Sequence, residues 1–166
     1  MKKYIVASLM LVLVFASCTE NQVAKELFVR VDSLMEEHPD SALSLLDSAY
    51  AIKEDLPKSQ RMRYELLRAK AQNKAYVDFT TDSVMKEVVE YYDAHGTANE
   101  QMEAHYLLGC TYRDLHESPM ALSCYLDATE KADTLSDDCD YGTLMRIWGQ
   151  VADEFYKQGM PYKELE

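Results

Sequence analysis

Glycine and proline are scarce in this chain of 166 residues, with five glycines and four prolines. Together they make up about 5% of the residues, whereas about 12% is typical of globular proteins. A β-sandwich or barrel of this size needs many tight turns, which these two residues supply, so their scarcity favours helices. Hydrophobic residues account for 48% of the chain, which is enough for a core and argues against wholesale disorder.

Positive charge is also in short supply, with 17 Lys and Arg against 29 Asp and Glu and a net charge of −12. A protein that binds a phosphate backbone needs a basic face, so we expect no nucleic-acid partner. The chain lacks a Gly-x-Ser-x-Gly elbow, a His-Glu-x-x-His pair and a glycine loop for phosphate. Its four histidines have no metal-ligand spacing. We therefore expect no enzyme activity, no cofactor and no metal.

A long hydrophobic run is missing as well. The apolar stretch over residues 5–15 is shorter than the about 20 residues that a membrane-spanning helix needs. It follows Lys2 and Lys3 and ends shortly before Cys18, which is the arrangement of a signal peptide. This segment resembles a bacterial lipoprotein signal, whose cysteine becomes the lipidated first residue. An ordinary secretory signal with a coincidental cysteine is the alternative.

The resemblance implies a signal peptide over residues 1–17 and a lipidated Cys18 with a short tether over residues 18–22. The membrane is then a partner through the lipid on Cys18, and the location is the bacterial cell envelope. Thr19 stands where lipoproteins retained at the inner membrane of enterobacteria carry Asp, so the outer membrane is expected.

Apolar residues recur at steps of three and four through the rest of the chain, which is typical of amphipathic helices. We expect helices over residues 20–37, 41–54, 59–76, 80–94, 98–115, 119–133 and 142–157, with an eighth beginning at residue 162. Thr97 and Glu100 have the spacing of a capping box, and Gly96 is expected at the left-handed position that ends the preceding helix. No segment alternates with the period of a strand.

The segment from residue 102 onward carries the clearest internal repeat. It holds Leu108, Gly109, Tyr112, Ala121, Tyr125 and Ala128. This spacing resembles a tetratricopeptide repeat (TPR), in which small residues let two antiparallel helices pack closely. A second unit starts at residue 145, which is 43 residues later, whereas the usual period is about 34 residues. The acidic loop over residues 135–140 carries most of the insertion and is expected to be exposed.

Looser helix pairs over residues 23–56 and 61–95 extend the pattern upstream. The sequence therefore predicts an all-α protein, a TPR-like α-solenoid of about three and a half repeats over residues 23–166. The last helix partner only begins at residue 162, so we expect the array to be incomplete at its C-terminus. Trp148, Val151 and Phe155 are expected on one apolar face, part of which stays uncovered and promotes association. Cys110 and Cys124 are expected as small, buried apolar residues of the core.

The strings beginning at His38 and Glu90 are similar to those of TPR lipoproteins from gut Bacteroidetes. The resemblance implies a membrane-anchored scaffold that binds an unidentified protein or peptide, with the first helix of each pair lining a groove. The candidate groove residues are Tyr106, Arg113, Asp114, Arg146, Tyr156, Lys157, Gln72 and Asn73. The alternatives are the N-terminal sensory or scaffolding part of a longer regulatory protein and, with less support, an envelope enzyme with an unrecognised site.

Overall fold

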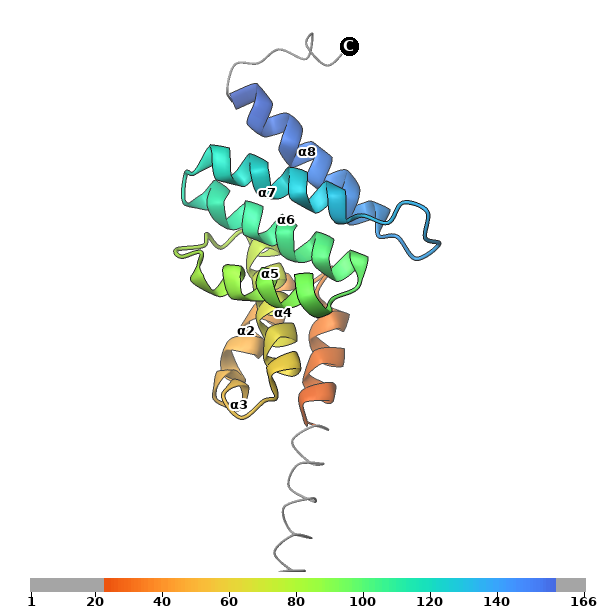
Figure 1. Ribbon diagram of the computed structural model, residues 1–166. Helices are drawn as coiled ribbons and strands as arrows, with labels where there is room; N and C mark the ends of the chain where they lie inside the picture. The colour runs from red at the N-terminus through yellow and green to blue at the C-terminus, as the bar shows by residue number, and fades with distance from the viewer. Residues whose placement is uncertain (1–22, 158–166) are drawn as a thin grey trace, which may run out of the picture. The chain divides into compact units, whose positions relative to one another are not determined.

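The computed structural model describes residues 23–157, and this part of the chain consists of helices joined by turns, without a strand (Figure 1). The expectation of an all-α protein is confirmed. Residues 23–34 form the first helix, and the helices after it are α2 (Pro39–Ser48), α3 (Tyr50–Lys53), α4 (Lys58–Lys74), α5 (Ser83–His95), α6 (Ala98–Asp114), α7 (Ser118–Lys131) and α8 (Tyr141–Lys157). Cys18 and the helix expected to begin at residue 162 lie outside the described residues.

Helix ends follow the local chemistry of the chain. The predicted capping box at the start of α6 is present: Glu100 N–H donates to Thr97 Oγ1 (3.3 Å), and Thr97 N–H donates to Glu100 Oε2 (2.8 Å). The helix expected over residues 41–54 is in fact two helices, because the backbone leaves helical geometry at Ala49 (φ −93°, ψ 8°).

The interpretation of Gly96 is wrong. This residue follows α5 with φ −87° and ψ 159°, which is extended backbone open to any residue. A Cβ at this position would lie 2.8 Å from the Tyr92 ring and from Tyr92 O, so the site requires a small residue for space and not for a left-handed turn. The left-handed residues in the described part of the chain are instead Tyr76, at φ 55° after α4, and His116, at φ 61° after α6.

The described residues divide into two compact units, residues 23–75 and residues 76–157. The division falls inside the helix pair expected over residues 61–95. Within the first unit α4 packs against α2, and within the second α5 packs against α6. The two helices of that expected pair therefore have their main contacts in different units.

The first unit has an apolar core that includes Phe28, Leu46 and Tyr64. Tyr64 is fully buried, and its hydroxyl donates a hydrogen bond to Leu46 O at 2.7 Å, which joins α4 to α2. Burial raises the pKa of Tyr64 to about 12. The ion pairs of Arg63 with Asp32 and of Lys74 with Glu36 lie at the surface of the same unit.

The second unit is a succession of four helices, in which α5 packs on α6, α6 on α7 and α7 on α8 (Figure 1). The contact between α6 and α7 is the most extensive of these. It is centred on Gly109, where an added Cβ would lie only 2.5 Å from Cδ1 of Tyr125. The prediction that Gly109 permits close approach of two helices is confirmed, as is the burial of Cys110 and Cys124. Both cysteines are free thiols.

Candidate binding surface

Six of the eight candidate groove residues belong to the second unit, while Gln72 and Asn73 belong to the first. Both of the latter are half-buried, and Gln72 Oε1 accepts a hydrogen bond from Arg68 Nη1 at 3.3 Å. Tyr106 is only 8% exposed, and its ring centroid lies 6.0 Å from that of Tyr125. These three side chains therefore offer little surface to a partner.

Arg113 and Asp114 form a polar network at the end of α6. Arg113 donates to Asp114 Oδ1 (2.9 Å) and to Gln150 Oε1 on α8 (3.3 Å), while Asp114 Oδ2 accepts from Phe79 N–H (3.1 Å). The Tyr125 hydroxyl on α7 lies 3.5 Å from the same Gln150 oxygen. This network joins α6, α7 and α8. Arg113 holds α8 against α6 through Gln150, and Asp114 in turn holds the Arg113 side chain in place.

Burial alone would lower the pKa of Arg113, but the Asp114 carboxylate that accepts its hydrogen bond raises it above its ordinary value. Burial also raises the pKa of Cys110, so this thiol is not a reactive nucleophile. We assign the network a structural role.

The remaining candidates lie on α8. Arg146 is exposed and donates to Thr143 Oγ1 at 2.7 Å, and Tyr156 is 76% exposed. Lys157 pairs with Asp153 (2.7 Å) and Glu154 (3.0 Å), and these two carboxylates raise its pKa. Arg146, Tyr156 and Lys157 therefore lie at the solvent-exposed surface of α8.

The outward face of α8 carries a row of large apolar side chains, which we call the α8 stripe. Its members are Tyr141 (52% exposed), Met145 (75%), Trp148 (52%) and Tyr156 (76%). Their spacing of four, three and eight residues places them on one side of the helix, since one turn takes about 3.6 residues. Within the second unit this is the largest grouping of exposed apolar side chains on any one of the described helices.

The face expected to hold Trp148, Val151 and Phe155 is partly uncovered, as predicted: Trp148 is half-exposed, Phe155 is half-buried and Val151 is buried. The side of α8 that faces α7 holds Leu144, Ile147 and Val151. The steps of three and four from Leu144 to Val151 were the available signal for the buried face. Tyr141 and Met145 lie exposed beside Trp148 and were not predicted from the sequence.

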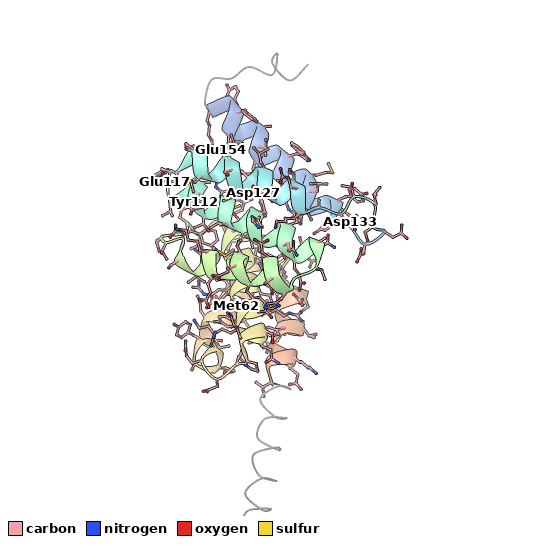
Figure 2. All side chains as sticks on the ribbon, in the orientation of Figure 1. Met62, Tyr112, Glu117, Asp127, Asp133 and Glu154 are labelled. Carbon is pink, nitrogen blue, oxygen red and sulfur yellow. The ribbon has the colours of Figure 1, made fainter. Side chains whose placement is uncertain are left out.

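The acidic loop between α7 and α8 meets the stripe at Tyr141, whose hydroxyl donates to Thr134 O in the loop at 2.8 Å. Figure 2 shows Asp133 where this loop leaves α7. Asn99 on α6 fastens the loop, because its amide donates to Asp138 O (2.7 Å) and accepts from Asp140 N–H (3.0 Å). The prediction of an exposed loop is confirmed, with Leu135 96% exposed.

A polar hollow of about 210 Å³ lies between this loop and the start of α6. The residues that line it are Thr97, Ala98, Asn99, Asp133, Ser136, Asp138 and Cys139. Asp138 accepts a hydrogen bond from Ser136, and Asp133 accepts one from Leu135 N–H. None of the cations in residues 23–157 pairs with Asp133, Asp137 or Asp138.

Within residues 23–157, no group of three His, Cys, Asp or Glu side chains is placed to hold a metal ion. The same residues include no helix with the length and apolar character required to cross a bilayer. No family model matches the chain, and no curated protein or solved structure matches it either.

Proposed function

We propose that this chain is a TPR-type helical-repeat lipoprotein, anchored in the bacterial cell envelope through Cys18, that binds a protein or peptide and catalyses no reaction. The repeat is supported by the order of packing in the second unit, where each helix contacts the next in sequence. The close contact of Gly109 with Tyr125 supports it further. Helices α6 and α8, which begin the two expected repeat units of the second unit, have the same length of 17 residues.

One observation carries the binding function, and it is the α8 stripe. Apolar side chains scattered singly over a surface are ordinary, but a contiguous row marks an interaction site. Tyr and Trp are favoured as binding anchors because they bury a large area with few rotatable bonds. A face with Met145 and Trp148 at its middle and tyrosines at its ends matches a surface that receives the apolar side of another helix.

Site-specific photo-crosslinking in cells tests this proposal. A photoreactive amino acid at position 145 stands in the middle of the stripe, and one at Val29, which is 70% exposed in the first unit, is the matched control. We expect a defined adduct with another protein from position 145 and none from position 29. The same adducts from both positions, or none from position 145, would show that the stripe is not the binding surface.

A further inference from the structure

The charge around the α8 stripe identifies the kind of partner that fits it. The chain from Asp127 to Lys157 holds eight acidic and three basic residues. Two of the three cations already pair with acids, since Lys131 binds Asp93 and Lys157 binds Asp153 and Glu154. The stripe therefore lies in a region of unbalanced negative charge.

This charge is concentrated at one end of the stripe. In the described part of the chain, no cation pairs with Asp133, Asp137 or Asp138. Their loop is joined to the stripe by Tyr141, the first residue of the stripe, which donates a hydrogen bond to the loop. Two of these carboxylates border the polar hollow, which has room for an ammonium or guanidinium group. An apolar row with an acidic end is complementary to a helix that has an apolar side and a basic end.

From this complementarity we infer that the α8 stripe binds a basic amphipathic helix of another protein. The partner's apolar side chains cover Met145 and Trp148, and its Lys or Arg side chains lie against the loop carboxylates. A second copy of this chain fits poorly, because a net charge of −12 makes two copies repel each other. The inference rests on the proposed function and adds the chemical class of the partner.

Trp148 makes the test direct, because it is the single tryptophan of the chain and lies inside the stripe. The probes are three synthetic 18-residue peptides: an amphipathic helix of Leu and Lys, the same helix with Glu in place of Lys, and a Lys–Ser peptide without an apolar side. A helix of this length is about 27 Å long and matches the about 25 Å of α8. The full chain is held in phosphatidylcholine vesicles, and Trp148 emission is recorded during titration.

We expect the Leu–Lys peptide to shift Trp148 emission to the blue with saturation at one peptide per chain. The Leu–Glu and Lys–Ser peptides should bind at least tenfold more weakly. The double variant Asp137→Asn/Asp138→Asn should weaken Leu–Lys binding roughly three- to tenfold at low salt, as expected for two exposed ion pairs, and high salt should remove this difference. The control Glu87→Gln/Glu90→Gln removes two exposed charges from α5 and should bind as the unaltered chain does.

Equal binding of the Leu–Lys and Leu–Glu peptides would overturn the basic partner and leave the proposed function intact. The basic partner would also be overturned, and the proposed function left intact, if neither peptide shifted Trp148 emission while the photoreactive residue at position 145 still formed an adduct with another protein in cells. Trp148 emission that is already blue-shifted before any peptide is added would overturn both proposals, because another segment or a second copy would then cover the stripe.

Discussion

Gly109 and Gly149 show how one residue type has opposite roles on two helices of the same unit. A Cβ at Gly109 would collide with the Tyr125 ring, whereas a Cβ at Gly149 meets nothing within 4 Å. In the interior of a helix, Gly costs about 0.5–1 kcal/mol relative to Ala. Gly109 is therefore needed for the close packing of α6 against α7. Gly149 lowers the stability of α8, and no packing contact within the described chain requires a glycine there.

The same substitution at these two glycines should have opposite effects. Gly109→Ala should lower the free energy of unfolding by roughly 1–3 kcal/mol, because overpacking separates α6 from α7, and Gly109→Leu should do so at least as strongly. Gly149→Ala should raise it by about 0.5–1 kcal/mol through helix propensity. Urea titrations followed by circular dichroism measure both. Equal effects at the two positions would contradict the close contact at Gly109.

His116 ends α6 in a conformation that favours glycine. Its N–H donates to Arg113 O (3.0 Å), and the next N–H, of Glu117, donates to Tyr112 O (2.9 Å), which together form a Schellman motif. The side chain is exposed and has φ 61°, so nothing in its contacts compensates the backbone strain.

Replacing this histidine with glycine should therefore stabilise the protein. We expect His116→Gly to raise the free energy of unfolding by about 1 kcal/mol, measured by thermal melts. Glu90→Gly is the control, because Glu90 lies exposed inside α5, where glycine costs about 0.5–1 kcal/mol and should lower stability. A loss of stability in His116→Gly would mean that the turn does not hold this conformation.

At the scale of the helices, Asp93 connects three elements. The carboxylate on α5 lies 2.7 Å from Lys131 Nζ on α7 and 3.0 Å from His105 Nε2 on α6. Burial alone would raise the pKa of Asp93, but the hydrogen bonds from Lys131 and His105 lower it below its ordinary value of 3.8. A lowered carboxyl pKa contributes stability above the ordinary value and loses it as the pH falls through the folded-state pKa.

The stabilising effect of Asp93 should therefore depend on pH. Asp93→Asn should lower the free energy of unfolding at pH 7, by less than about 1 kcal/mol because Asp93 is partly exposed and solvent screens the pair. At pH 2–3 the variant and the unaltered chain should be nearly equal. Urea titrations at the two pH values provide the test, and a difference that grows as the pH falls would contradict this role for Asp93.

The helices themselves could be predicted from sequence because their signals are local. The apolar period and the Thr97–Glu100 capping box depend on residues a few positions apart, and both agree with the structure. The outward face of α8 could not be predicted in the same way. Which side of α8 is buried depends on its contact with α7, so Leu144 and Ile147 were not predicted as the buried side, although a partly uncovered face with an exposed Trp148 was.

The groove residues show the same limit. Arg113 and Asp114 were chosen for their repeat positions, but a network through Gln150 and Phe79 uses them to hold the helices together. These partners lie about 35 residues away in the chain, and no short-range pattern connects them. The loop carboxylates, in contrast, were correctly expected at the surface, because an acidic segment without apolar residues at helical spacing has no face to bury.

At the scale of the whole molecule, the proposed function requires a lipid anchor at Cys18 as well as the binding face on α8. The lipidation site lies outside the described residues and rests on the sequence alone. Cys18→Ser should block lipidation and move the protein out of the membrane fraction, because the apolar stretch before it is too short to anchor the chain as a spanning helix. Cell fractionation and blotting measure this, with Cys139→Ser as the control that should stay in the membrane. Equal membrane retention of both variants would remove the lipoprotein proposal.

The central claim is that the α8 stripe is open to solvent and available to a partner, and acrylamide quenching of Trp148 in the purified, partner-free chain tests it most directly. Acrylamide is uncharged, so the net charge of −12 does not repel it from the indole. With Trp148 half-exposed, we predict red-shifted emission and acrylamide quenching well above that of a buried tryptophan, although below that of free tryptophan in water. Blue-shifted emission with strong protection from acrylamide would contradict the claim, because the stripe would then already be covered.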